Sequence, residues 1–236
     1  MDTDHTNKTF VYDKLASEKR WDSFANKYET ARRLRLIFGT LLDESELKNS
    51  LFLDAGSGGG HFSHAAESLG AHVMSLDVGL NLLKQVANRC NSTKIVGSVF
   101  ELPVKKNVFD IVLSTEVIEH TPAPIMSLQG LSSVVKPGGL LVLTVPCRLW
   151  NPLVDLASFL KLRPYEGYEN FLWPGDLRNA LETLNFSIEK LVGFNFCPFF
   201  YDKLDPLFSF FDKMYGQSMP WLMVNIAVRA RKREVS

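Results

Sequence analysis

The sequence predicts an α/β protein with a Rossmann-like, doubly wound sheet. Two observations predict it: short apolar runs alternate with helical patterns between residues 51 and 145, and the first run leads into a glycine-rich loop. Continuous apolar strands separated by helices are typical of a parallel sheet that is covered on both faces. Right-handed crossovers between such strands then give an open, doubly wound sheet.

The predicted elements of this sheet follow one another along the chain. Apolar residues at helical spacing precede it, over residues 14–42. The predicted strands cover residues 51–53, 71–76, 94–96, 109–113 and 140–145. Helical patterns separate them at residues 61–69, 80–89 and 124–135.

The pattern changes after residue 145. Helices are predicted at residues 149–162 and 174–184, and Asp176 lies near the start of the second. Strands are predicted at residues 188–192 and 221–228, and a basic tail, residues 229–233, follows. Residues 195–220 are rich in aromatic side chains and proline. We expect them to cap the sheet, with a wall for a hydrophobic acceptor or a membrane-dipping surface as the alternatives.

The composition excludes several classes of protein. The chain has 236 residues, of which 46% are apolar, so it can bury one good core. Its 26 basic and 26 acidic residues balance, which argues against a nucleic-acid partner. The three cysteines are scattered and indicate neither a disulfide framework nor a zinc site. Because the N-terminus lacks a secretory signal and no apolar run reaches the ~20 residues of a spanning helix, we expect a reduced, cytoplasmic protein.

The glycine-rich loop runs from Asp54 to His61 and joins the first strand to a helix. Glycines allow close backbone approach to a ligand, and the N–H groups at the start of the helix favour an anionic group. By itself such a loop could be only a tight turn. However, Asp77 ends the second strand, where a carboxylate can accept both hydrogens of a ribose diol. Because His61 stands where a dinucleotide-binding loop has its third glycine, a nucleoside with an amino-acid tail fits better than a pyrophosphate.

Four motifs in the same order resemble the class I S-adenosylmethionine-dependent methyltransferases of the methyltransferase type 11 group. They are the loop with Asp54, Gly56, Gly58 and Gly60, Leu102-Pro103 before Phe109-Asp110, the run from Ser114 to His120, and the run from Lys136 to Gly139. The resemblance covers residues 51–146. It implies a mostly parallel, seven-stranded sheet with an antiparallel last strand, N-terminal helices and an aromatic-rich C-terminal cap.

The resemblance also implies a division of one methyltransferase domain over residues 1–236. We expect N-terminal helices in residues 1–45, a cofactor-binding core in residues 46–146, and substrate-side helices, cap and last strands in residues 147–236.

The same resemblance assigns residues to the cofactor, S-adenosyl-L-methionine. Gly56 and Gly58 should approach its methionine portion, and Thr115 should lie beside its methyl group. Many relatives carry Asp where this chain has Ser98, so the adenine contact is expected to be weaker or to use only the backbone. The expected cofactor-binding residues are Asp54, Gly56, Ser57, Gly58, Gly60, Asp77, Val78, Ser98, Val99, Thr115 and Arg35.

Within this family, the motifs are most similar to the ubiquinone-biosynthesis O-methyltransferases. Arg35-Leu36 resembles their cofactor-contacting arginine, but the alignment slips by a residue and leaves Arg33 as a second candidate. Trp150 and the residues around Pro174 resemble the region that is associated with membrane contact in those enzymes. Residues 195–220 do not match that branch, so its quinol substrate is not carried over.

Glu116, Glu119 and His120 allow three interpretations. At this spacing they could present oxygen and nitrogen ligands to a divalent metal, and similar runs in quinone and small-RNA 2′-O-methyltransferases resemble metal ligands. His120, with Glu119, could instead act as general base. Alternatively, the run only begins the next helix and packs the loop. Because no histidine follows His120 as a further ligand, we expect no metal and keep the three residues as the alternative metal site.

The sequence therefore predicts an enzyme that moves a methyl group to oxygen or nitrogen of a small, hydrophobic or lipid-linked acceptor. The apolar residues of the helix predicted at 149–162 and the aromatic residues from Phe194 to Phe211 favour such an acceptor and peripheral membrane contact. A non-catalytic cofactor-binding scaffold and a metal-assisted RNA 2′-O-methyltransferase are the alternatives.

Overall fold

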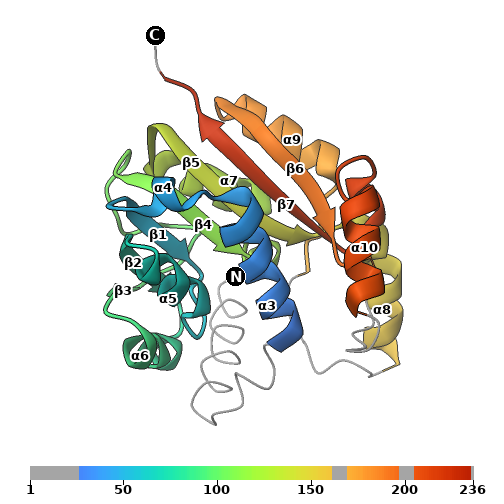
Figure 1. The fold of residues 1–236 in the computed structure, drawn as a ribbon, viewed down its shortest axis with the longest axis horizontal. Helices are drawn as coiled ribbons and strands as arrows, with labels where there is room; N and C mark the ends of the chain where they lie inside the picture. Colours follow the sequence, from blue (N-terminus) through green and yellow to red (C-terminus); the bar gives the residue numbers. More distant parts are fainter. Residues whose placement is uncertain (1–26, 161–168, 197–204, 235–236) are drawn as a thin grey trace, which may run out of the picture.

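The computed structural model describes residues 27–160, 169–196 and 205–234. Within them, the chain forms a seven-stranded sheet with the order β3-β2-β1-β4-β5-β7-β6 (Figure 1). The strands are β1 (Leu51–Ala55), β2 (His72–Asp77), β3 (Thr93–Val96), β4 (Phe109–Thr115), β5 (Val135–Pro146), β6 (Phe186–Phe194) and β7 (Asn225–Lys232). The pairs from β3 to β5 are parallel, whereas β7 runs antiparallel to both β5 and β6. The predicted mostly parallel sheet with an antiparallel last strand is confirmed.

The strand order reverses between β1 and β4. The chain moves outward from β1 to β2 and β3, and then places β4 on the other side of β1. At such a switch point the loops from two neighbouring strands diverge, and ligands bind in the crevice outside the carboxyl ends. The loops that diverge here follow Ala55 and Thr115, and both contain predicted site residues.

Helices cover both faces of the sheet. One face is covered by α3 (Lys27–Leu36), η1 (Ile37–Leu41), α4 (Glu44–Leu47) and α5 (His61–Ser68). The other face is covered by α7 (Pro124–Val134) and α9 (Pro174–Thr183). The remaining helix beside the parallel strands, α6 (Leu80–Arg89), packs against α5, β2 and β3.

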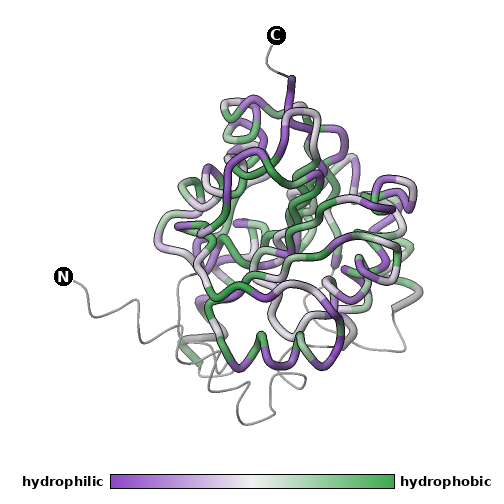
Figure 2. Tube along the Cα trace, turned by 90° about the vertical axis from the view of Figure 1, so that its left-hand side faces the viewer, coloured by the Kyte–Doolittle hydropathy of each residue, from purple (hydrophilic) through white to green (hydrophobic). Residues whose placement is uncertain are grey.

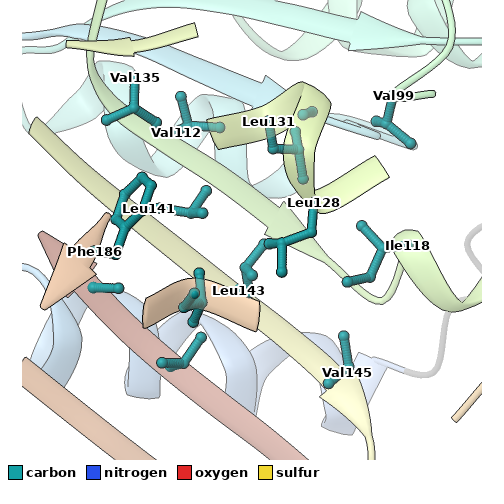
Figure 3. Packing of buried hydrophobic residues seen from close by; sticks show 14 of the residues in the cluster. Val99, Val112, Ile118, Leu128, Leu131, Val135, Leu141, Leu143, Val145 and Phe186 are labelled. Carbon is teal, nitrogen blue, oxygen red and sulfur yellow. The ribbon is translucent and has the colours of Figure 1, made fainter. Parts of the chain in front are cut away.

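The strands carry continuous apolar runs because both of their faces are buried. Successive residues of a strand point to opposite faces. Thus Phe52 belongs to the cluster with Ile37, while its neighbour Leu53 belongs to the cluster with Leu128. Figure 3 shows Leu128 packed among the strand residues Leu141 and Leu143, and Figure 2 shows the hydrophobic strands in the middle of the molecule.

Short helices surround the carboxyl ends of the strands. They are η2 (Ile118–His120), η3 (Arg148–Trp150), α8 (Asn151–Phe159), α10 (Asp205–Tyr215) and η5 (Pro220–Leu222). The indole N–H of Trp150 donates to the Leu222 carbonyl at 3.2 Å, which joins the start of α8 to the segment that precedes β7. The predicted helix at 149–162 is thus η3 followed by α8, and residues 161–162 lie outside the described residues.

The described part of the predicted aromatic cap contains a helix that the sequence analysis did not predict, α10. Phe211 on α10 stacks on Phe196 at a ring-centroid distance of 4.8 Å. Residues 197–204, which include three of the aromatic residues noted above, lie outside the described residues, as do residues 14–26 of the predicted N-terminal helix.

The prediction of a basic tail after the last strand is wrong, because β7 continues to Lys232. The Arg229 side chain is only 8% exposed and lies between two carboxylates, Glu46 of α4 and Glu189 of β6, at 2.6 and 2.5 Å. Hydrogen bonds from Arg229 lower the pKa of Glu46 to about 2. Glu46 and Glu189, which are far from Arg229 in the sequence, therefore neutralise its charge. This pairing allows a basic residue to occupy a buried position in β7.

Candidate active site

The loop after β1 has the backbone conformation that its glycines predict. Gly56, Gly58 and Gly60 have φ angles of +84°, +51° and +83°, in the region that favours glycine. A Cβ atom on Gly56 would lie 2.3 Å from Cγ2 of Val117, so the loop after β1 is packed directly against the loop after β4.

Asp77 joins this loop to the end of β2. Its Oδ2 accepts the N–H of Gly58 at 2.9 Å, and its Oδ1 accepts the N–H of Gly79 at 2.9 Å. The side chain is buried, with the whole residue 7% exposed. The structure therefore brings together the glycine loop and the acidic residue that the sequence analysis assigned to one ligand.

Asp54 lies beneath the loop and is fully buried. Its Oδ2 accepts a hydrogen bond of 2.6 Å from the Ser63 hydroxyl, whereas its Oδ1 has no partner among the described residues. Burial, reinforced by the charge of Asp77 and opposed by the bond from Ser63, raises the pKa of Asp54 to about 7. One oxygen of this carboxyl is therefore available to a ligand.

The predicted adenine side is formed by the ends of β2 and β3. Val78 is 37% exposed there. The Ser98 hydroxyl accepts the N–H of Phe100 at 3.1 Å, so it is engaged within its own turn. Val99 is 5% exposed and belongs to the same buried hydrophobic cluster as Leu128 (Figure 3).

Glu116 follows Thr115 at the carboxyl end of β4 and has a positive φ of 53°. Its N–H donates to the Thr144 carbonyl at 2.9 Å, which extends the β4–β5 pairing by one residue. Its Oε2 accepts a 2.8 Å hydrogen bond from the side-chain amide of Asn225, and its Oε1 has no partner among the described residues. Burial raises the pKa of Glu116, although the positive charge of Arg33 opposes the shift.

Glu119 lies on η2 and is 1% exposed. Its Oε1 is 3.9 Å from Nε2 of His120, and its Oε2 has no partner among the described residues. Burial, together with the negative charge of Glu116, raises the pKa of Glu119 well above its usual range. In the described part of the chain, no three His, Cys, Asp or Glu side chains gather in a way that could hold a metal ion.

Of the two candidate arginines on α3, Arg33 is the one that acts on the acidic residues. Its charge lowers the pKa of both Glu116 and Glu119, and it forms an ion pair with Glu29 at 2.9 Å. Its Nε is buried and has no partner among the described residues. Arg35, in contrast, is exposed.

Two residues of this region, Asn195 and Asn225, were not predicted from the sequence. Asn195 follows β6 and Asn225 begins β7, and the amide of Asn195 donates to Oδ1 of Asn225 at 2.9 Å. The available signal was a lone asparagine within an otherwise apolar stretch, residues 221–228.

The buried side-chain atoms without partners in the described residues gather at this edge of the sheet. Buried polar atoms are normally hydrogen-bonded, so such a concentration indicates a ligand site. These atoms include Asp54 Oδ1 and Ser57 Oγ on the side of β1, and Arg33 Nε, Ser114 Oγ, Glu116 Oε1, Glu119 Oε2 and Asn195 Oδ1 on the side of β4.

Comparison with known proteins agrees with this arrangement. Residues 53–143, from the first strand to the fifth, match the family model described as a methyltransferase domain. The chain belongs to the S-adenosylmethionine-dependent methyltransferases. The matched residues contain the glycine loop, Asp77 and the acidic run after β4, whereas Arg33, Asn195 and Asn225 lie outside them.

Among curated proteins, this methyltransferase is similar to ubiquinone biosynthesis O-methyltransferases. That of Xanthomonas campestris pv. campestris (strain B100) is 29% identical over 164 residues, which cover 64% of this chain and 69% of the relative. That of Nitrosospira multiformis is 25% identical over 221 residues, which cover 84% of this chain and 91% of the relative.

Solved structures share the fold along nearly the whole chain. The magnesium protoporphyrin IX methyltransferase of Synechocystis with bound S-adenosylhomocysteine superposes with a TM-score of 0.68 at 19% identity, covering 95% of this chain and 99% of that one. A methyltransferase of Thermotoga maritima gives a TM-score of 0.68 at 16% identity, covering 96% of this chain and 100% of that one.

The residues present fit the family's cofactor, S-adenosylmethionine. The glycine loop has the positive φ angles that let its backbone approach a ligand closely, and Oδ1 of Asp54 beneath it is an acceptor without a partner in the described residues. Among the helices that the structure describes, none has the length and apolar character to cross a membrane.

Proposed function

We propose that this methyltransferase transfers the methyl group to an oxygen or nitrogen of a small, hydrophobic or lipid-linked acceptor. One observation carries the proposal. Glu116 and Glu119 follow β4 beside the glycine loop, Glu116 half-buried and Glu119 fully buried, and each has a buried carboxyl oxygen without a partner in the described residues. A hydroxyl or amine that donates to these oxygens would stand beside the cofactor.

The cofactor supplies the methyl group on a sulfonium centre, so the protein's main task is to hold the acceptor in line and at near-attack distance. In this proposal Gly56 and Gly58 border the methionine portion, and Asp54 accepts from its ammonium group. The neighbouring loop residues Ser57 and Gly60 complete the cradle.

The ribose and adenine would lie along the ends of β2, β3 and β4. We assign Asp77 to the ribose hydroxyls, with Val78 beside it. Ser98 and Val99 would contribute mainly backbone groups, since the Ser98 hydroxyl already accepts a hydrogen bond within its own turn and the Val99 side chain is buried in the core. Thr115, which is 8% exposed at the end of β4, would border the methyl group.

The proton of the acceptor would pass to Glu119 or His120. A carboxylate with a raised pKa is a stronger base than an ordinary one, and burial raises the pKa of Glu119. His120 lies beside Glu119, with its Nε2 3.9 Å from Oε1, which is too long for a direct hydrogen bond, so the two residues are alternative bases. Arg33 would balance the negative charge on this side of the site.

The exposed apolar residues of α8 and α10 support a hydrophobic acceptor. Leu153, Leu156 and Phe159 on α8 are 40%, 53% and 83% exposed, and Leu207 and Phe210 on α10 are 50% and 54% exposed. Large apolar side chains grouped at a surface mark contacts with lipid, ligand or protein. The relatives in Xanthomonas campestris and Nitrosospira multiformis are ubiquinone biosynthesis O-methyltransferases, which favours oxygen as the acceptor atom. We place such an enzyme in the cytoplasm, with peripheral contact with a membrane.

Two measurements test the proposal. Calorimetry should detect binding of S-adenosylmethionine to the folded protein, and Gly58→Arg should abolish that binding. Release of S-adenosylhomocysteine is then measured on a panel of quinols, phenols and lipids, and the blank contains no acceptor. Binding without turnover on any member would refute the acceptor class, whereas no binding by folded protein would refute the cofactor site.

Treatment with a chelator distinguishes the two functional interpretations of Glu116, Glu119 and His120, as general bases or as metal ligands. If Glu119 and His120 act as bases, turnover survives treatment with the chelator. Loss of turnover that Mg²⁺ restores would instead identify Glu116, Glu119 and His120 as metal ligands.

A further inference from the structure

We infer that Asn225 is a positioning residue for methyl transfer: it fixes the Glu116 carboxyl group so that Oε1 faces the acceptor. The inference rests on the proposed function, which places Glu116 at the acceptor site. Asn225 lies outside the residues that match the methyltransferase family model, which end at residue 143.

The topology of the sheet brings Asn225 to the active edge. Because β7 runs antiparallel to its neighbours, its first residue lies beside the carboxyl ends of the parallel strands. Asn225 pairs with Pro146, the last residue of β5, and with Phe194, the last residue of β6. A residue near the C-terminal end of the chain thus reaches the carboxyl group that follows β4.

Both ends of the Asn225 amide are engaged. Nδ2 donates to Oε2 of Glu116 at 2.8 Å, and Oδ1 accepts from Nδ2 of Asn195 at 2.9 Å. An amide that is held at both ends cannot rotate without losing two hydrogen bonds, one buried and one part-buried. The Nδ2 group of Asn225 therefore stays directed toward Glu116 and donates to its Oε2.

Asn195 is itself held in place by hydrogen bonds from the backbone to the Asp212 carboxylate. Its φ angle of +61° turns its own N–H and that of Phe196 toward the carboxylate of Asp212, which accepts them at 3.0 and 2.8 Å. Asp212 also forms an ion pair with Arg32 on α3. The chain of contacts therefore runs from Glu116 through two asparagines to α3.

The same helix carries Arg33, whose charge acts on Glu116 directly. Glu116 is thus linked to α3 in two ways, by the hydrogen bonds through the two asparagines and by the charge of Arg33. Glu116 needs such support, because a non-glycine residue with positive φ and a buried carboxyl group is held only by its surroundings. Removal of the Asn225 donor frees the carboxyl group to rotate away from the acceptor.

The exchange Asn225→Asp tests the role of a single atom, the Nδ2 donor. It keeps the oxygen that accepts from Asn195 and replaces the amide nitrogen that donates to Glu116 by an oxygen. We expect kcat to fall by about 10- to 100-fold, the cost of a slightly misplaced group. The Kd of S-adenosylmethionine should stay within about twofold, because Asn225 is not part of the glycine loop. Asn179→Asp, on the exposed surface of α9, is the matched control and should leave both values unchanged.

A double-mutant cycle separates positioning from a general effect on the fold. If Asn225 acts through Glu116, then Asn225→Asp causes no further loss of kcat in the Glu116→Gln background. Additive losses, or a Glu116→Gln protein with full turnover, would overturn the inference and leave the proposed function intact. Absence of turnover by the unmodified enzyme on the whole acceptor panel would instead refute the proposed function, and the inference with it.

Discussion

Arg32 on α3 forms a buried ion pair with Asp212 on α10, with side chains that are 8% and 15% exposed. Asp212 also accepts the backbone N–H groups of Asn195 and Phe196. Burial raises the pKa of Asp212, and the charge of Arg32 and the two N–H groups act in the opposite direction. One carboxylate therefore fastens an early helix, a late helix and the end of β6 to one another beside the candidate active site.

Removal of Arg32 should destabilise the protein strongly. Arg32→Met keeps much of the apolar stem but leaves the buried Asp212 carboxylate without its charge partner, which typically costs about 3–5 kcal/mol. Urea denaturation gives the change in unfolding free energy. Arg178→Met is the control, because Arg178 and Glu182 form a pair at 3.9 Å whose side chains are each 49% exposed, and exposed pairs contribute about 0–1 kcal/mol. Equal effects of the two exchanges would contradict a structural role for the Arg32–Asp212 pair.

The sequence predicted the parallel half of the fold well because local pattern and tertiary burial agree there. A strand such as β4, Phe109–Thr115, is covered on both faces, so its apolar run identifies it without knowledge of its neighbours. The glycine loop and Asp77 were equally accessible, because their conformations and spacing are local properties. The predicted roles of these residues in cofactor binding stay predictions.

The features that the sequence did not predict depend on contacts between distant segments of the chain. Arg229 was assigned to a basic tail because charge usually indicates exposure, whereas its burial depends on the ion pairs with Glu46 and Glu189 and on a hydrogen bond to the Leu41 carbonyl. α10 was missed within a segment of mixed aromatic residues and prolines. Asn225 belongs to no motif, and its relation to Glu116 arises from the insertion of β7 between β5 and β6.

Gly56→Ala should weaken cofactor binding through a steric effect. Its Cβ would lie 2.3 Å from Cγ2 of Val117, and the φ angle of +84° is strained for alanine. Either the glycine loop or the loop after β4 must move, so we expect the Kd of S-adenosylmethionine to rise by at least about tenfold, equivalent to 1.4 kcal/mol. Calorimetry provides the measurement.

The double variant Gly56→Ala with Val117→Ala should recover part of that affinity, because it removes the nearest clashing atoms. Gly175→Ala is the matched control, since no atom lies within 4 Å of the position of its Cβ. If the double variant binds no better than Gly56→Ala alone, backbone strain and not the contact with Val117 limits the loop.

Polar exchanges on α8 should impair turnover only of acceptors with a long apolar tail. Leu156→Gln and Phe159→Ser replace side chains that are 53% and 83% exposed, so the fold should tolerate both exchanges. We expect a higher KM for the long-tailed acceptor, and an unchanged KM for a short-tailed analogue with the same reacting group. Met126→Gln, 53% exposed on α7, is the control. Equal KM changes for both acceptors would contradict contact between α8 and the tail.

Asp54 should make both stability and cofactor binding depend on pH near neutrality. Burial raises the pKa of Asp54 to about 7 in the folded protein, from 3.8. Between these values the folded state holds a proton that the unfolded state releases, so this group's contribution to stability falls as pH rises through 7 and is constant above about pH 8.

The exchange Asp54→Asn removes the titrating carboxyl group and, with it, this pH-dependent contribution to stability. The stability of the variant relative to the parent should therefore increase from pH 5 by roughly 1.4 kcal/mol per pH unit, with about half that slope at pH 7, which gives about 2 kcal/mol between pH 5 and pH 7. Taking the difference between the two proteins cancels the contributions of Glu116 and Glu119, whose pKa values are also raised by burial. Urea denaturation at several pH values measures it, and parallel pH profiles for the two proteins would contradict the assignment.

The same carboxyl group links proton release to cofactor binding. If Oδ1 of Asp54 accepts from the ammonium of S-adenosylmethionine, the ionised form binds best, and the ligand lowers the pKa of Asp54. The Kd should then fall by up to about tenfold per unit as pH rises from 6 to 7, and change little above pH 8. Calorimetry in buffers of different ionisation enthalpy should detect the released proton at pH 6.5. Asp54→Asn should show neither effect, and proton release by that variant would assign the titration to another group.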